Sequence, residues 1–335
     1  MRIGVFDHLD RSDSPLVRYY EERLELIEMY ERAGFYSYHL AEHHATPLGM
    51  APSPSVFLAA VAQRTRRMRF GPMVYALPLY HPVRLAEEIC MLDQMSGGRL
   101  DIGFGRGASA FDLRNFGQDP DVAQAVYEES LEIILKCLAG SPLNHRGRYF
   151  SFEDVPICLD TLQKPRPPVW YGAHAPESAE RAARRGLHII SLDPSMLARS
   201  IIERYREVWQ GLHGSGALPH LGIGRFVLVA DTDAEAMRLA RSAYARWHES
   251  FNWLFRYRGH ELPRHARPPT YDELVERGQG IAGSSETVTN WLNRDLEETG
   301  ANYLVAQLMF GNLAHTDARR SIDLFANVVA PRLVG

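Results

Sequence analysis

Histidine, acidic and arginine side chains stand at the ends of several short apolar segments of the chain. A histidine beside a carboxylate can move a proton near neutral pH, and an arginine between glycines can meet an anion at close range. The residues with this potential are Asp7 and His8 at the end of residues 2–7, Glu42, His43 and His44 at the end of 37–42, Gly105, Arg106 and Gly107 after 99–104, and His174 after 168–173. Together they indicate proton transfer and anion binding, provided that the fold brings them to one place.

Short apolar segments alternate with helical patterns along the chain, and these elements must position the polar clusters. Residues 16–33 show the helical pattern, with Leu16, Tyr20, Leu24 and Ile27 near its period. The strand-like segments are residues 2–7, 37–42, 69–77, 99–104, 168–173, 188–192, 222–230 and 302–310. Since each is followed by helix-like sequence, we predict an α/β protein with a closed (β/α)8 TIM barrel. The carboxyl ends of its strands meet at one mouth, where the polar clusters would converge.

Two segments do not fit the repeating unit. Residues 140–167, after the fourth strand, are rich in proline and aromatic residues, and residues 249–283, between the seventh and eighth strands, contain Pro263, Pro268 and Pro269. We expect residues 249–283 to form an active-site lid. No repeat or low-complexity linker divides the sequence, so we expect residues 1–335 to form a single domain.

One motif resembles a metal site. His39-Leu40-Ala41-Glu42-His43 matches the H-x-x-E-H zinc pattern, which requires both histidines on one face of a helix. Residues 37–40 are strand-like, and in a strand His39 and His43 would lie roughly 13 Å apart, too far to share a zinc ion. We therefore predict no metal at this cluster.

A glycine-rich turn follows the fourth strand. Gly103–Ala108 fits the dinucleotide pattern G-x-G-x-x-G/A, but no amphipathic helix follows immediately to receive a pyrophosphate. We interpret Gly105, Arg106 and Gly107 as backbone that approaches a planar ring or a phosphate, with Arg106 as the partner of the anion.

A second turn, after the fifth strand, leads into a helix that begins at Pro176. Gly172, Ala173, His174 and Ala175 would present free backbone N–H groups, and Ser178 would offer a hydroxyl. A phosphate monoester could bind there on the helix dipole, although an ordinary strand–helix turn explains the residues equally well.

The composition excludes several classes of protein. The 335 residues carry a formal net charge of −4, which provides no basic field for nucleic acid or an anionic membrane. No apolar stretch near Met1 is long enough for a signal peptide or a membrane span, so we expect a cytoplasmic protein. The three cysteines, Cys90, Cys137 and Cys158, are widely spaced, and we expect them to be buried and unpaired.

An ordered series of motifs over nearly the whole chain resembles the bacterial luciferase-like flavin-dependent oxidoreductases. The series comprises Glu42-His43-His44, Leu77-Pro78, His81-Pro82-Val83-Arg84, residues 92–99, Gly103–Gly107, Asp112–Gly117 and Glu177-Ser178-Ala179. Members of this family bind reduced FMN, or in one branch a reduced deazaflavin, in the barrel mouth. The resemblance implies a two-component monooxygenase that uses reduced FMN and dioxygen, through a flavin 4a-hydroperoxide, to oxygenate a small organic substrate.

The resemblance also assigns roles to residues. His43 matches the catalytic histidine of the family, for which we expect a near-neutral pKa, and Glu42 and His44 would orient it. Met73-Val74 matches the position of a non-prolyl cis peptide behind the isoalloxazine ring. Arg106 matches the arginine that meets the FMN phosphate, and Gly172 to Ser178 match the loop on the phosphate side.

Two departures from the family pattern concern the phosphate. Luciferases carry a further arginine where this chain has Gln124 and an acidic residue where it has His174. A different flavin tail would fit such a change, so the alternative function is deazaflavin-dependent hydride transfer on the same fold. A flavin-storage protein would lack His43, and a metal-dependent hydrolase would need more carboxylates at the strand ends.

The resemblance implies two partners. No second nucleotide domain is visible in the sequence, so an NAD(P)H:flavin reductase would supply the reduced flavin. The family usually forms a homodimer through the second and third barrel helices, where Ala59, Ala60, Ile89, Cys90 and Leu92 would either make the seam or pack inward. Nothing in the sequence identifies the organic substrate.

Overall fold

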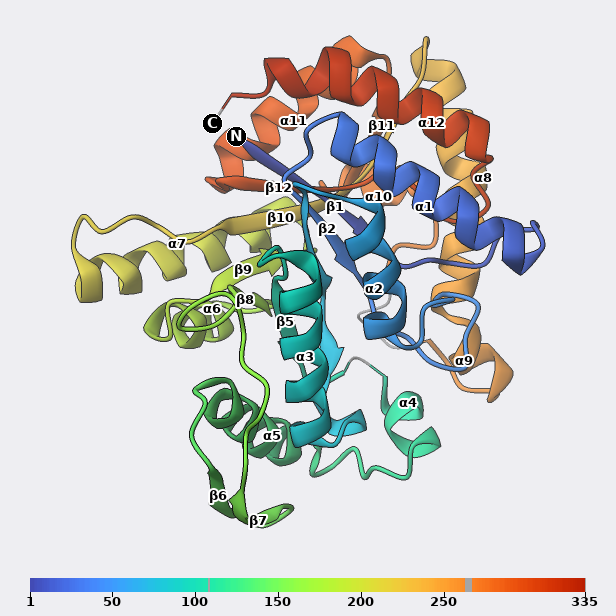
Figure 1. Ribbon diagram of the computed structural model, residues 1–335. Coiled ribbons are helices and arrows are strands. Elements are labelled where there is room, and N and C mark those ends of the chain that lie inside the picture. The colour runs from blue at the N-terminus through green and yellow to red at the C-terminus, as the bar shows by residue number, and fades with distance from the viewer. Residues whose placement is uncertain (108, 263–266, 335) are drawn as a thin grey trace.

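The strands form a nearly closed parallel barrel surrounded by helices (Figure 1). The computed structural model describes residues 1–107, 109–262 and 267–334. The barrel strands are β1 (Arg2–Asp7), β2 (Ser37–Leu40), β3 (Arg69–Pro72), β4 (Tyr75–Ala76), β5 (Ile102–Gly105), β8 (Val169–Gly172), β9 (His188–Ser191), β10 (Leu221–Val229) and β12 (Tyr303–Gln307). They pair in parallel in the order β3-β2-β1-β12-β10-β9-β8-β5-β4, which confirms the predicted barrel.

The segment predicted as a strand over residues 69–77 consists of two pieces. β3 pairs with β2 and β4 pairs with β5, and between them the Met73–Val74 peptide bond is cis, as the sequence analysis predicted. An isolated bridge between Phe70 and Leu100 also links β3 to the residues before β5. The nine strands therefore correspond to the eight predicted segments.

Helices follow the strands as predicted and cover the outside of the barrel (Figure 1). Pro54, Pro82 and Pro176 each occupy a first helical position, where the missing N–H is not needed. The helices are α1 (Leu16–Arg32), α2 (Pro54–Arg64), α3 (Pro82–Ser96), α4 (Ala110–Asn115), α5 (Ala123–Leu138), α6 (Pro176–Arg184), α7 (Ser195–His213), α8 (Asp233–Phe251), α9 (Trp253–Tyr257), α10 (Tyr271–Glu276), α11 (Ser285–Thr299) and α12 (His315–Leu324), with short turns at Leu77–Leu79, Phe325–Val329 and Ala330–Arg332.

The insertion after the fourth predicted strand contains an antiparallel hairpin, β6 (Leu143–Arg146) and β7 (Ser151–Val155). The hairpin lies at the lower edge of the view, away from the barrel strands (Figure 1).

The insertion between the seventh and eighth predicted strands differs in part from the predicted lid. Its last residues form β11 (Gly280–Gly283), which pairs in parallel with the carboxyl half of β10. Residues 280–283 therefore belong to the sheet, because β10 is long enough to pair with β12 at one end and β11 at the other. Pro263 lies outside the described residues.

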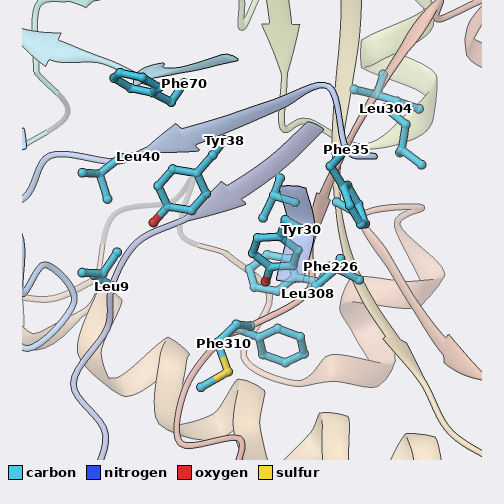
Figure 2. Close-up of a cluster of buried hydrophobic side chains, with 14 of the residues drawn as sticks. Leu9, Tyr30, Phe35, Tyr38, Leu40, Phe70, Phe226, Leu304, Leu308 and Phe310 are labelled. Atoms are coloured by element: carbon cyan, nitrogen blue, oxygen red, sulfur yellow. The ribbon is translucent and has the colours of Figure 1, made fainter. Parts of the chain in front are cut away.

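Two apolar layers hold the barrel. The larger lies between strands and helices, and Figure 2 shows ten labelled side chains of this kind: Leu9, Tyr30, Phe35, Tyr38, Leu40, Phe70, Phe226, Leu304, Leu308 and Phe310. The smaller fills the barrel interior with Phe6, Ala41, Met73, Trp170, Ile190, Tyr303 and Val305. Side chains alternate between the layers along a strand, so neighbouring residues such as Val5 and Phe6 fall in different layers.

The burial of several side chains outside the barrel strands differs from expectation. Cys158 is exposed, whereas Cys90 and Cys137 are buried as predicted, because Cys158 lies in the irregular segment after β7. Ile89, Cys90 and Leu92 of the predicted dimer seam pack inward. The exposed apolar side chains on α2 and α3 are instead Val56, Met91 and Met95. Among the described residues, no helix has both the length and the apolar character needed to cross a membrane.

Candidate active site

A cavity of about 580 Å³ opens at the carboxyl ends of the barrel strands. Its size lies within the usual range for small-molecule and cofactor sites, roughly 300–1,000 Å³. Its lining includes most residues singled out in the sequence: Glu42, His43, Met73, Val74, Gly105, Arg106, Gly107, Gly172, His174, Ala175 and Ser178. Ala173 does not line it, since it is fully buried with its N–H bonded to the Ile190 carbonyl, and neither does His44, which hydrogen-bonds to Glu42. The barrel thus brings together the polar clusters that the sequence separates.

Glu42 is an anchor between two segments at the cavity wall. Its side chain is 1% exposed, and Oε1 accepts a hydrogen bond from Nε2 of His44 at 2.8 Å. Its other oxygen, Oε2, accepts from the backbone N–H of Ala76 on β4 at 3.0 Å. With both oxygens engaged, Glu42 fixes the backbone on either side of His43.

His43 stands in the cavity wall between these two residues. Burial, with a smaller contribution from the charge of His44, lowers the pKa of His43 from 6.5 to about 4. The near-neutral pKa expected from the sequence is therefore wrong for this structure, because the surrounding apolar groups disfavour the imidazolium. At pH 7 the ring is neutral, so it can accept a proton at one nitrogen and donate one at the other.

A second histidine, His8, stacks on His43. The two ring centroids lie 5.6 Å apart with 22° between the planes. Nε2 of Gln307 lies 3.1 Å from Nδ1 of His8, and burial, followed by the charge of His43, holds the pKa of His8 well below its usual value. Two neutral imidazoles thus lie side by side, and His8 was recognised from the sequence only as a residue at a strand end.

Asp7, by contrast, does not reach the cavity. Its carboxylate accepts hydrogen bonds from Arg23 of α1 at 3.0 and 3.1 Å and from the Tyr38 hydroxyl at 3.1 Å. The prediction that it converges on the mouth is wrong, since strand alternation turns it toward α1. Asp7 therefore serves the packing of α1 on the barrel.

Two arginines line the rim of the cavity. Arg106 follows β5, and Arg181 lies one turn into α6. Both are exposed, and neither has an ion-pair partner in the part of the chain that the structure describes. Gln124 also lines the rim but donates to Glu128 at 2.8 Å. Arg181 thus places a second guanidinium at the rim, although this chain has Gln124 where luciferases carry an arginine. The sequence analysis did not identify Arg181, because it considered only residues at strand ends.

The turn after β8 is less open than predicted. Oγ of Ser178 accepts hydrogen bonds from the N–H groups of His174 and Ala175 at 3.2 and 3.1 Å and donates to the Ala175 carbonyl at 2.6 Å. The expected free N–H groups are therefore already satisfied, because Ser178 caps its own helix. Nδ1 of His174 lies 3.0 Å from Asp193 Oδ2, so a carboxylate is close to the position where the family carries an acid.

Two glycines of β5, Gly103 and Gly105, have a packing role. A Cβ at Gly103 would lie 2.4 Å from the Pro72 carbonyl oxygen, and one at Gly105 would lie 2.4 Å from Cγ2 of Val74. These two glycines thus allow β5 to approach the β3–β4 segment closely, and Gly105 and Gly107 also line the cavity. Ala108, the last residue of the motif, lies outside the described residues.

The opposite wall combines aromatic rings with charged groups that the sequence analysis did not single out. Phe226, Trp247 and Phe251 line it together with Arg225, Arg267 and Gln279. Arg225 is fully buried, and its Nε donates to Asp295 of α11 at 2.8 Å. An arginine inside the apolar β10 sequence was the visible signal for this pair. Arg267 and Gln279 come from the insertion, where no local pattern marks them.

His39 lies apart from His43, in the barrel interior. Its ring is fully buried, and Nε2 lies 3.0 Å from the Tyr303 hydroxyl. Burial lowers the pKa of His39 to about 3. His39 thus belongs to the packed interior, and the two histidines of the H-x-x-E-H pattern have separate surroundings.

A parallel barrel with a cavity at its carboxyl mouth is the architecture of TIM-barrel enzymes. Residues 1–303 match the model of the luciferase-like monooxygenases, and the chain belongs to this family. Uncharacterized protein y4wF of Sinorhizobium fredii is 41% identical over 93% of this chain and 92% of its own. The oxygenase component of the flavin-dependent trigonelline monooxygenase of Acinetobacter baylyi is 31% identical over 70% of this chain and 67% of its own.

Solved structures share the fold. Monooxygenase RslO1 from Streptomyces bottropensis has a TM-score of 0.89 at 24% identity and full coverage of both chains. The oxygenating constituent of 3,6-diketocamphane monooxygenase from Pseudomonas putida, in complex with FMN, has a TM-score of 0.78 at 23% identity, covering 100% of this chain and 99% of that one. An F420-dependent secondary alcohol dehydrogenase has a TM-score of 0.76 at 18% identity, covering 100% and 99%. The fold thus occurs with both kinds of flavin.

Proposed function

We propose that this protein is the oxygenase component of a two-component monooxygenase that uses reduced FMN and dioxygen to oxygenate a small organic substrate. The observation that carries the proposal is the cavity lined by a neutral His43 and by Arg106 and Arg181, two rim arginines without an ion-pair partner among the described residues. Relatives named as monooxygenases support oxygenase chemistry, and the name "oxygenase component" of one of them supports a separate flavin reductase.

The cavity residues fit a flavin. Phe6, Met73, Ile190 and Val305 provide apolar surface for a planar ring system, and Arg106 and Arg181 provide two guanidinium groups for a phosphate at the rim. Reduced flavin would supply the electrons that activate dioxygen. The remaining cofactor-site candidates that line the cavity, Val74, Gly105, Gly107, Gly172, His174, Ala175 and Ser178, would complete this wall, and the buried Ala173 would support it.

The protein's own contribution would be proton control at the reacting oxygen. As a neutral ring, His43 would donate a hydrogen bond to a reacting oxygen or take a proton from it. Glu42 and His44 would act as positioning residues, since their mutual hydrogen bond and the bond to Ala76 fix the His43 backbone. His8 would support the ring of His43 through the stacking contact.

The proposal extends to the lid, the homodimer and the cellular location. The described parts of residues 249–283 before β11 would act as the lid of one domain comprising residues 1–335, since Phe251, Arg267 and Gln279 already line the cavity. The family resemblance supports a homodimer through α2 and α3, with Val56, Met91 and Met95 as the exposed apolar side chains. Dependence on a reductase that uses NAD(P)H supports action in the cytoplasm.

The alternative is deazaflavin-dependent hydride transfer, which the structural likeness to F420-dependent enzymes favours. Anaerobic titration with photoreduced FMN and, separately, with reduced deazaflavin distinguishes the two. We expect reduced FMN to bind and deazaflavin to bind at least tenfold more weakly. Binding of deazaflavin alone would replace the proposal with the alternative.

A further inference from the structure

Arg267 brings a second, separate positive charge into the cavity. Its Nη1 donates to the carbonyl oxygen of Leu192 at 2.6 Å, and Nε2 of Gln279 donates to the same oxygen at 2.9 Å. A guanidinium has five N–H donors, and the Leu192 carbonyl uses one of them. The side chain is therefore held in place while most of its donors remain available to the cavity that it lines.

No group in the described lining of the cavity forms an ion pair with Arg267. The lining contains four arginines, Arg106, Arg181, Arg225 and Arg267, and one carboxylate, Glu42. Arg225 is neutralised by its buried ion pair with Asp295, and Arg106 and Arg181 stand at the rim where the flavin phosphate is proposed to bind. Of these four arginines, Arg267 alone lies inside the cavity, away from the rim, without an ion pair to one of these groups.

Asp193 is the carboxylate whose charge acts on Arg267, but its oxygen already has two other hydrogen-bonding partners. Its Oδ2 lies 3.0 Å from Nδ1 of His174 and accepts a hydrogen bond from the Ser191 hydroxyl at 2.8 Å. In the described residues, no carboxylate lies within ion-pair distance of Arg267. Burial lowers the pKa of Arg267, and the charge of Asp193 offsets this only in part.

Aromatic rings that line the same cavity as Arg267 lead to the stacked pair His8 and His43. Trp247 lies 4.8 Å from Phe226 and 5.0 Å from Phe251, measured between ring centroids. The same indole lies 5.5 Å from His8, which in turn stacks on His43 at 5.6 Å. His8 and Arg267 line the same cavity, and the charge of Arg267 contributes to the lowered pKa of His8.

We propose that Arg267 binds the carboxylate of the substrate, and that the substrate is a small organic acid with an apolar or aromatic body. The inference rests on the proposed oxygenase function, whose active site it completes. Guanidinium and carboxylate form paired, charge-assisted hydrogen bonds, which fix orientation as well as position. With the carboxylate at Arg267 and the body against Trp247, Phe226 and Phe251, the far end of the acid would face His43.

Matched acid and amide pairs test this inference. Benzoate with benzamide, cinnamate with cinnamamide, and octanoate with octanamide differ in charge but hardly in shape. Their binding to the FMN-loaded protein is measured by saturation-transfer NMR, for the wild type and for Arg267→Gln, Arg267→Lys and Arg256→Gln. Arg256 is the matched control because it lies on α9 of the same insertion, is exposed and does not line the cavity.

We expect at least one acid to bind about tenfold more tightly than its amide, as charge-assisted hydrogen bonds require. Arg267→Gln should abolish that preference and leave the amide unchanged, Arg267→Lys should retain part of it, and Arg256→Gln should behave as the wild type. Equal binding of every acid and its amide, or an equal loss of both in Arg267→Gln, would overturn the inference.

Flavin binding in the same variants separates this inference from the proposed function. If Arg267→Gln weakens FMN but not riboflavin, the arginine serves the phosphate and the inference is overturned while the proposed function stands. If no variant, including the wild type, binds FMN, the proposed function fails. The acid–amide comparison on the flavin-free protein then still shows whether Arg267 selects a carboxylate.

Discussion

His43 is expected to stay neutral throughout the physiological pH range. Its pKa of about 4, against 6.5 for an unperturbed histidine, means that burial disfavours the imidazolium. At pH 6.5 such a ring is protonated in about one molecule in 300, whereas an unperturbed ring is half protonated, and the difference corresponds to about 3 kcal/mol. Proton transfer by His43 must therefore start from the neutral ring.

The assay is an NMR titration of protein labelled with ¹⁵N at histidine, from pH 4 to pH 8. The His43 signals are assigned by their loss in His43→Asn, with His81→Asn, at an exposed position outside the cavity, as the control. We expect no titration of His43 above about pH 5, and a loss of roughly 10²–10⁴ in oxygenation rate in His43→Asn with FMN affinity retained. A titration midpoint near 6.5 would refute the reasoning.

Three further predictions follow from the contacts of the site and the barrel interior. Glu42→Gln should lower the oxygenation rate about tenfold and leave the FMN Kd unchanged, because a neutral acceptor holds His44 and Ala76 less firmly; parallel kinetics and fluorescence titration check both values. Arg106→Ala and Arg181→Ala should each weaken FMN about tenfold without affecting riboflavin, and equal losses would exclude a phosphate role. The buried His39, with a pKa of about 3, resists protonation when folded but protonates near 6.5 when unfolded, so its contribution to stability is lost as pH falls below 6.5. Protonation of His39 in the unfolded chain should lower the free energy of unfolding by about 2 kcal/mol between pH 7.5 and pH 5. Urea unfolding of His39→Asn should therefore show a smaller pH dependence than the wild type.

The fold was largely predictable because strand and helix periods are local. Each predicted strand has a counterpart in the barrel, and the start of α6 at Pro176 follows from local signals. The exception, β11, is a short glycine-containing strand that gains its place only by pairing with the far half of β10. Sequence patterns describe one segment at a time and do not show such pairing.

The candidate site was predictable where its residues follow strands. Glu42, His43 and Arg106 were found this way, because the barrel collects all strand ends at one mouth. Arg181 and Arg267 were missed since they lie inside a helix and inside an insertion, and only packing turns them toward the cavity. The low pKa of His43 was also invisible, because it depends on groups that come from distant segments.

The most direct test of the proposed function is a stopped-flow experiment in which dioxygen is mixed with the anaerobic complex of the protein and reduced FMN. We predict that the bound flavin reoxidises in two phases, with the second slower than reoxidation of free reduced FMN, and that this second phase becomes faster in His43→Ala. Failure of reduced FMN to bind, or reoxidation indistinguishable from that of free flavin in both proteins, would contradict the account.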